Sequence, residues 1–259
     1  MFCNIVMSRE LIWQMFKRDF LAGYKKSFLG ISWIIISPVV GIAAWVFMQM
    51  TGLLRPGELS IPYPAYVLIG TSMWGLFMGF YQAASQTLSS GSELIMQVHY
   101  PHEALLIKQT AQNLAGFVIS FALVVVILVF FGVVPSWRII FLPLIILPLF
   151  FLGAAIGLIT SMISVVAVDI NNAINVVMGM MMWLTPVIYT SNVPSPVVQA
   201  IIKWNPLTYL VCSARDIVIY GRLYDAGGYA LSAAAAVLVF LVAWRLFYVS
   251  ENKVVERMI

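Results

Sequence analysis

The stretch that decides the fold of this chain runs from Lys17 to Gly30 and reads KRDFLAGYKKSFLG. It is the densest cluster of Lys and Arg in a chain of which only 9% is charged. Directly after it, residues 31–54 contain no Asp, Glu, Lys or Arg. Roughly 20 apolar residues cross the hydrocarbon core of a bilayer, and cations gather on its cytoplasmic side. The stretch therefore marks where the chain enters a membrane, and from which side.

The composition supports an integral membrane protein. Of the 259 residues, 62% are hydrophobic, and the mean hydropathy is +0.98. A soluble domain of this length needs far more polar surface to cover its core. The net charge of +4 is modest, and nucleic acid is not a suitable partner for so apolar a chain.

The gaps between charged residues predict an all-α fold with six transmembrane helices. Long uncharged runs locate the spans, because a charge at mid-bilayer costs about 2.5–3.5 kcal/mol on insertion scales. The runs are continuous rather than alternating, which favours helices over a barrel. The expected spans lie at about 31–51, 65–88, 108–132, 139–165, 172–190 and 228–248. The chain is then a single transmembrane domain, 1–259, made of an interface helix and entrance loop (1–30), spans one to five (31–190), an outer segment (191–227) and span six with its tail (228–259).

Residues 4–21 are predicted to form an amphipathic helix in the cytoplasmic interface. Trp13 and Phe16 fall on its apolar face, whereas Lys17 and Arg18 fall on its polar face. The segment is too charged to span, so it lies in the membrane surface or packs on the protein itself. Six spans place both termini on one side, and the larger number of Lys and Arg there predicts that this side is cytoplasmic.

Residues 186–228 are unusual, because four prolines interrupt apolar pieces of helical length. The pieces at 197–204 and 207–220 are too short to span. They predict two re-entrant half-helices on the outer face, between spans five and six. Non-helical backbone at membrane depth survives only where protein or a water-lined cavity covers it, so this region is expected to line a pore mouth.

The acids, cysteines and histidines show no catalytic or metal-binding pattern. Cys3 and Cys212 fall on opposite sides in the predicted topology and cannot pair within the chain. His99 and His102 lie three residues apart, but only Glu103 accompanies them. Nucleophilic triads and phosphate-binding glycine loops are absent from the sequence. We therefore expect no metal and no cofactor, and we expect any energy source on another polypeptide.

Aromatic residues are frequent inside the predicted spans. Lipid-facing belts and core packing explain many such residues. The functional alternative is a channel whose rings stack on the flat, CH-rich faces of a sugar chain. The candidate channel-lining residues are Trp33, Trp45, Trp74, Phe77, Tyr81, Trp183 and Tyr189.

Five motifs follow one another along nearly the whole chain. They are RDFxxxYKKSxLGxxW from Arg18 to Trp33, the run Tyr63–Gly70 with Trp74, the segment Glu93–Glu103 with its Tyr-Pro-His-Glu end, Trp183–Tyr189, and Trp204–Thr208. In this order the chain resembles the ABC-2 type polysaccharide-export permeases, the membrane subunits of ABC transporters for O-antigen, capsule and teichoic acid. One departure is Val168 before Asp169, where the family often has Arg.

The resemblance implies a homodimer in the bacterial inner membrane, with a pore at the dimer interface and two separate ATP-binding subunits on the cytoplasmic side. The implied substrate is a polyprenyl-diphosphate-linked glycan, with O-antigen as the favoured case. The residues expected at the lipid-diphosphate entrance are Arg18, Lys25, Lys26, Leu29 and Gly30. The loop expected to take force from the ATPase contributes Glu93, Gln97, His99, Tyr100, His102 and Glu103.

Blander interpretations and two rival functions stay open at this point. The lysines are also explained by topology alone, and the loop by a solvated connector. An ABC-2 permease for drugs or small lipids would use a more closed cleft lined by Met and Leu. An integral-membrane transferase acting on lipid-linked sugars would need an acidic or metal cluster, which the sequence does not show.

Overall fold

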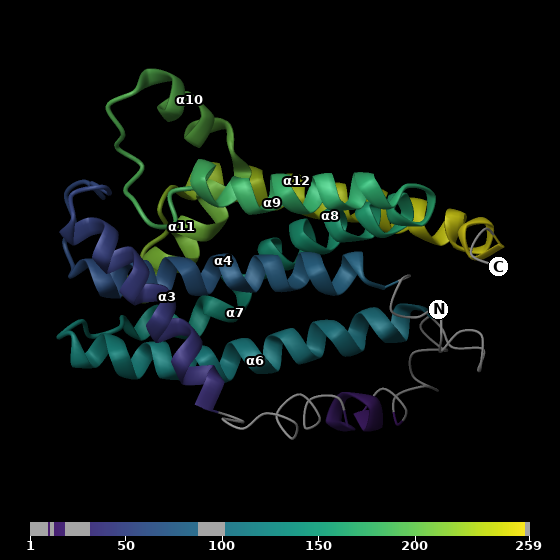
Figure 1. Cartoon of the computed structure of the whole chain (residues 1–259), viewed down its shortest axis with the longest axis horizontal. Helices are drawn as coiled ribbons and strands as arrows, with labels where there is room; N and C mark the ends of the chain where they lie inside the picture. The colour runs from purple at the N-terminus through teal and green to yellow at the C-terminus, as the bar shows by residue number, and fades with distance from the viewer. Residues whose placement is uncertain (1–9, 11–12, 19–31, 88–101, 257–259) are drawn as a thin grey trace.

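The computed structural model describes residue 10 and residues 13–18, 32–87 and 102–256. Every regular element in this part of the chain is helical, which confirms the predicted all-α fold (Figure 1). The elements are α3 (Trp33–Met50), α4 (Tyr63–Ser85), α6 (His102–Phe130), η2 (Trp137–Phe141), α7 (Leu142–Ile145), α8 (Leu147–Val166), α9 (Val168–Leu184), α10 (Pro196–Trp204), α11 (Pro206–Ile219) and α12 (Ala226–Glu256).

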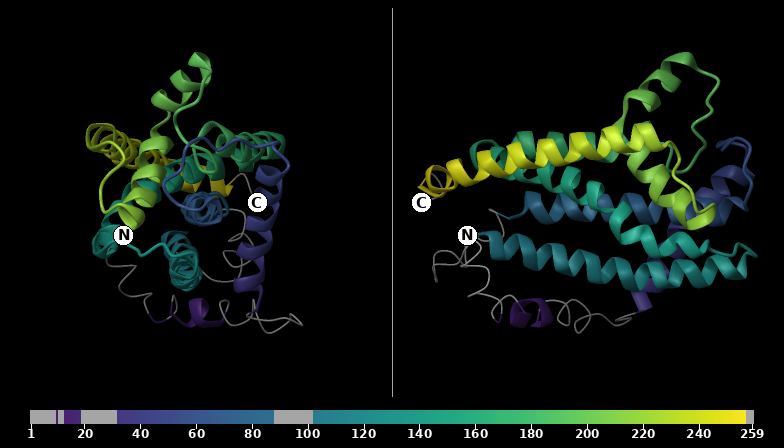
Figure 2. Two further views of the ribbon diagram at one scale, coloured as in Figure 1. Left: turned by 90° about the vertical axis from the view of Figure 1, so that its left-hand side faces the viewer. Right: turned by 180° about the vertical axis from the view of Figure 1, so that it is seen from behind.

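The long helices form an elongated bundle with α4 at its centre. Helix α4 packs against α8, α6, α11 and α3, and most of its side chains are buried. Helix α3 runs obliquely to the other long helices, and α10 projects from one end of the bundle (Figures 1 and 2). The C-terminal end of α12 lies at the opposite end. We call the end of the bundle that carries α10 and α11 the helical-loop end.

Three helical segments of the described chain are long and apolar enough to cross a membrane. They are Leu106–Phe130, Trp137–Ser164 and Ala226–Ser250, and they correspond to the third, fourth and sixth predicted spans. The apolar part of α3, Val39–Met50, is shorter than a span, and α9 has 17 residues. The membrane-spanning character of the fold is thus supported, whereas six complete spans stay a prediction.

Close contact between α4 and α8 depends on glycine. A Cβ atom at Gly157 would lie 2.4 Å from the Tyr81 carbonyl oxygen, and one at Gly153 would lie 3.0 Å from the Phe77 carbonyl oxygen. Small residues at these positions let two helix backbones approach, which is the usual means of packing helices in membranes. The contact makes α4 and α8 the rigid centre on which the other helices lie.

The boundaries of the fifth predicted span are wrong at both ends. It was expected at 172–190, but α9 begins at Val168, directly after the extended residue Ala167, and ends at Leu184. Asp169 lies exposed in the first turn, where a carboxylate is favoured by the helix dipole. The early end is explained by Pro186, which disfavours helical backbone at the residue before it.

The two short helices predicted in the proline-rich segment are confirmed as helices. Helices α10 and α11 each begin with a proline, a residue preorganised for the first helical position. Asn205 separates them, and its side-chain oxygen accepts a hydrogen bond from the backbone N–H of Leu207 at 3.0 Å. Their predicted re-entrant placement in the membrane stays a prediction.

Candidate functional site

A groove of about 470 Å³ lies between α3, α4 and α6. We call it the three-helix groove. Besides a few larger side chains its lining is made of small or uncharged polar residues, and none of the described lining residues is Asp, Glu, Lys or Arg. The polar ones are Ser37, Thr71, Ser72, Gln112, Asn113 and Ser120. Polar side chains inside a membrane protein face the protein interior or a hydrated cavity, so this groove is the candidate site.

Three glycines of the groove have no packing role. Among the residues that the structure describes, a Cβ atom at Gly41, Gly75 or Gly116 would meet nothing within 4 Å apart from its own chain neighbours and helix backbone. By contrast, Gly70 lies on α4, the helix that carries Gly75, and is closely packed. A Cβ atom at Gly70 would lie 2.2 Å from the Val187 carbonyl oxygen. Glycine costs a helix about 0.5–1 kcal/mol relative to alanine, so these three positions keep open space at a cost in stability.

Several polar groups of the groove already make hydrogen bonds to carbonyl oxygens of the helices that form it. The hydroxyls of Thr71 and Ser72 donate to the carbonyl oxygens of Val67 and Leu68, at 2.7 and 2.6 Å. The side-chain amide of Asn113 donates across the helix interface to the Leu76 carbonyl oxygen at 3.3 Å. These hydroxyls keep lone pairs for further hydrogen bonds. The groove therefore presents acceptors and small surfaces that suit a neutral hydrophilic solute.

Two of the predicted channel-lining aromatic residues meet beside the groove. Trp45, which lines it, packs edge to face on Trp183 of α9, with ring centroids 5.6 Å apart. Trp183 is 51% exposed, and its carbonyl oxygen accepts a hydrogen bond from the Tyr189 hydroxyl at 2.7 Å. Trp33 at the start of α3 is also exposed. The structure thus leaves these rings accessible in the protomer.

The three aromatic residues predicted on span two lie elsewhere. Trp74, Phe77 and Tyr81 are buried in the protomer core, and Phe77 and Tyr81 have no exposed surface. The Tyr81 hydroxyl donates to the Asn175 side-chain oxygen at 2.9 Å, which ties α4 to α9. Their own protomer thus encloses these three side chains as packing residues, and their channel-lining role stays a prediction.

The predicted entrance and coupling residues are only partly placed. Arg18 is described and exposed, whereas Lys25, Lys26, Leu29 and Gly30 lie outside the described residues. Of the predicted coupling loop, Glu93, Gln97, His99 and Tyr100 also lie outside them. His102 and Glu103 belong to the first turn of α6, where only the backbone is described. These roles stay predictions.

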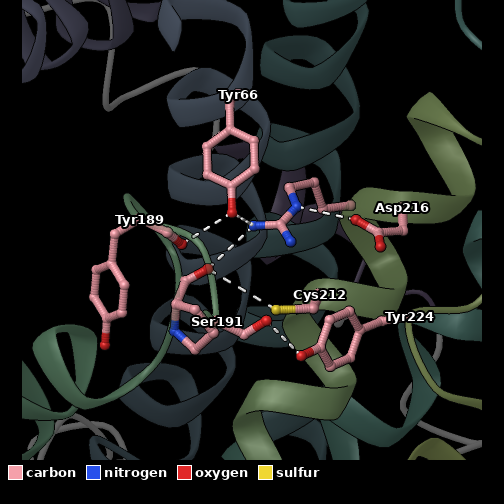
Figure 3. A network of polar contacts seen from close by, with 8 residues as sticks. Tyr66, Tyr189, Ser191, Cys212, Asp216 and Tyr224 are labelled. Atoms are coloured by element: carbon pink, nitrogen blue, oxygen red, sulfur yellow. Dashed lines mark hydrogen bonds and ion pairs between the residues drawn. The ribbon is translucent and has the colours of Figure 1, made fainter. Parts of the chain in front are cut away.

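Sequence reasoning missed a buried cation, Arg215 of α11. Its Nε atom donates to Asp216 Oδ1 at 3.1 Å, and its Nη1 atom donates to the Pro186 carbonyl oxygen at 3.1 Å and to the Tyr66 hydroxyl. The Tyr66 hydroxyl in turn donates to the Tyr189 carbonyl oxygen at 2.9 Å (Figure 3). The Arg215–Asp216 pair in an otherwise uncharged short helix was the available signal, because a buried charge needs partners.

This network fixes the turn that follows α9. It joins α4, residues 186–189 and α11 through side chains that are all at least half buried. Asn205 adds a second connection by donating to the Leu184 carbonyl oxygen at 3.2 Å and to the Thr185 hydroxyl at 2.9 Å. Together these bonds hold the end of α9, and with it the Trp183 ring, at a defined place beside the groove.

The long apolar helices and the uncharged polar groove they enclose define a helical membrane protein suited to moving a hydrophilic solute. Comparison with known proteins identifies the family to which the chain belongs. The sequence profile described as ABC-2 type transporter matches residues 10–219, and the chain therefore belongs to the ABC-2 type transporter family.

Similar proteins occur in two bacteria. The chain is 25% identical over 242 residues to the O-antigen export system permease protein RfbA of Myxococcus xanthus, with 92% of each chain covered. It is 22% identical over 219 residues to a protein of the same name from Klebsiella pneumoniae, with 83% of this chain and 82% of that protein covered.

Proposed function

We propose that this protein is the pore-forming subunit of an ATP-driven exporter that moves lipid-linked polysaccharide, in the first place O-antigen, across the cytoplasmic membrane. Membership of the ABC-2 family and the names of the similar proteins support this. The structural observation that carries the proposal is the uncharged, glycine-rich lining of the three-helix groove.

A glycan chain makes particular demands on its path. It is hydrophilic, so it needs hydrogen-bonding partners inside the membrane, but a moving chain must not be held by strong fixed charges. The groove offers hydroxyls and amides together with open glycine surfaces, and Trp45 and Trp183 supply rings on which sugar faces can slide. A drug or small-lipid permease would favour an apolar cleft, which this lining does not resemble.

The proposal includes a dimeric assembly with its ATPase. Two protomers form the pore, six spans place both termini in the cytoplasm, and two ATP-binding subunits dock there. Asn172 and Asn175 of α9 are exposed in the protomer, and polar side chains facing lipid are unfavourable. A second protomer that covers this face would remove that cost.

The entrance and the coupling loop complete the proposal. Arg18, Lys25 and Lys26 meet the diphosphate of the lipid carrier at headgroup level, where cations and anionic headgroups attract each other. Residues 92–103 transmit force from the ATP-binding subunit to the start of α6. ATP is bound by the partner, and the permease itself catalyses no reaction.

The proposal is tested by deleting the gene in its own host. Lipid-linked glycan should accumulate on the cytoplasmic side, and the intact gene should restore it to the cell surface. Restoration should fail when the partner ATPase carries a substitution that blocks ATP hydrolysis. Unchanged surface glycan in the deletion strain would overturn the proposal. ATP hydrolysis by the purified complex that responds to hydrophobic drugs or small lipids, and not to lipid-linked glycan, would replace it with the rival permease.

A further inference from the structure

A second cavity, of about 430 Å³, opens at the helical-loop end of the bundle between α10, α11 and residues 191–192 and 224–225. We call it the α10–α11 pocket. Its size falls in the range of ordinary small-ligand pockets. It shares no lining residue with the three-helix groove, so the proposed path does not account for it.

Direct hydrogen bonds hold the walls of this pocket. The Tyr209 hydroxyl donates to the Lys203 carbonyl oxygen at 2.8 Å, which ties α11 to α10. The Tyr224 hydroxyl donates to the Ser191 hydroxyl oxygen at 2.6 Å, which joins two loops (Figure 3). Asp225 accepts a bond from the Gly227 backbone N–H at 3.1 Å and so caps the start of α12. The pocket is therefore preformed by the fold rather than left between loose loops.

Glycine is also required at the base of the pocket. A Cβ atom at Gly228 would lie 2.3 Å from the Tyr209 ring and 2.8 Å from a carboxylate oxygen of Asp225. The absence of a side chain there lets Tyr209 lie against the first turn of α12. The ring is thereby held in one place, and its distance from the Tyr224 ring is 6.3 Å between centroids.

The lining combines aromatic rings with groups that bind hydroxyls. Tyr209 and Tyr224 supply the rings, Lys203 supplies an ammonium donor, and Asp225 supplies a carboxylate acceptor. Gln199 of α10 adds an amide, which both donates and accepts. A pyranose ring presents an apolar CH face and a rim of hydroxyls that each donate and accept. The lining matches both of these features.

One buried polar atom in this pocket lacks a partner. Thr208 lines the pocket, and the residue is 1% exposed. Its Oγ1 atom makes no hydrogen bond to any residue that the structure describes. A buried hydroxyl without a partner costs about 1–3 kcal/mol. A ligand hydroxyl that bonds to this oxygen would remove that cost.

We propose that the α10–α11 pocket binds one sugar residue of the exported glycan after it has left the membrane path. This inference rests on the proposed function, because it takes its ligand from the exported chain. The sugar ring lies against Tyr209 and Tyr224, and its hydroxyls bond to Thr208, Lys203 and Asp225. Binding here retains the chain on the outer side between cycles of the ATPase and opposes its return.

The test measures sugar binding to the purified complex of permease and ATP-binding subunits in lipid nanodiscs. The probe is the host's own glycan, released from its lipid and cut to short oligosaccharides, with saturation-transfer NMR as the readout. Thr208→Val removes the hydroxyl at nearly constant volume, and Lys203→Met removes the ammonium group from an exposed position. Each should weaken binding by about tenfold, the effect of one lost hydrogen bond.

Val197→Gln is the matched control, because Val197 lies on α10, is 68% exposed and does not line the pocket. It should leave binding unchanged. Binding that is absent, or equal in the native complex and both pocket variants, overturns the pocket proposal even if the gene still supports surface glycan. Failure of the proposed function itself would be seen separately, as unchanged surface glycan in the deletion strain.

Discussion

The guanidinium group of Arg215 lies over the Tyr66 ring, with its carbon 4.2 Å from the ring centroid, and also donates a hydrogen bond to the Tyr66 hydroxyl. Arg215 comes from the short helix α11 and Tyr66 from the first turns of α4. The pair therefore joins the central helix of the bundle to the helical-loop end. Asp216, Pro186 and Tyr189 complete the polar surroundings that a buried cation requires.

Replacing Tyr66 with Phe should destabilise the protein. The change removes the hydroxyl that bridges the guanidinium group and the Tyr189 carbonyl oxygen, and it leaves both buried groups short of a partner. We expect a loss of about 1–3 kcal/mol, measured as a lower melting temperature of the detergent-solubilised protein. Tyr63→Phe is the control on the same helix, because the buried Tyr63 hydroxyl has no partner among the described residues. An equal loss in both variants would contradict the network.

Alanine at two glycines should have opposite effects. Gly70→Ala places a Cβ atom 2.2 Å from the Val187 carbonyl oxygen, so α4 must move away from the turn after α9, at a cost of about 1–3 kcal/mol. Gly116→Ala fills open space in the groove and should stabilise α6 by about 0.5–1 kcal/mol. Thermal unfolding of the two variants checks the signs. A destabilised Gly116→Ala protein would show that the groove is packed rather than open.

Cys212 should resist alkylation in the folded protein. Helix α11 lies outside the three apolar spans, and burial raises the pKa of the Cys212 thiol to about 11. A raised pKa means less thiolate at any given pH, so reaction with N-ethylmaleimide stays slow on raising the pH from 7 to 9. The measurement uses mass spectrometry on membranes from a Cys3→Ser background. Fast modification before denaturation would show that α11 opens from its place.

Much of the fold follows from the sequence because its signals are local. Uncharged runs located the helices, and proline placed the starts of α10 and α11 within one residue of their observed positions. The boundaries of α9 were missed, because the chain bends at Ala167, ahead of the predicted start at 172. Nothing in the local sequence marks an extended alanine as a break.

The candidate site was only partly predictable, because it depends on contacts between helices and not on local signals. Trp45 and Trp183 were chosen as aromatic residues on separate spans, and their contact confirms proximity but not a role. Tyr81 was chosen by the same rule and is buried. Aromatic identity does not tell which face of a helix points inward. The open glycines of the groove were not predicted either, because a packing glycine and an open glycine are identical in sequence.

Trp183→Ala should impair export without unfolding the protein. Trp183 is 51% exposed and contacts Trp45 at the edge of the groove, so its loss removes a sliding surface for sugar while leaving the buried Arg215 network intact. We expect surface glycan to fall at least severalfold, measured by gel electrophoresis of envelope glycan in the complemented deletion strain. Trp137→Ala is the control, because that residue is 73% exposed and does not line the groove. Equal amounts of both variants in the membrane are verified by immunoblot. Normal surface glycan with Trp183→Ala would remove α9 from the path and leave the three-helix groove without its aromatic wall.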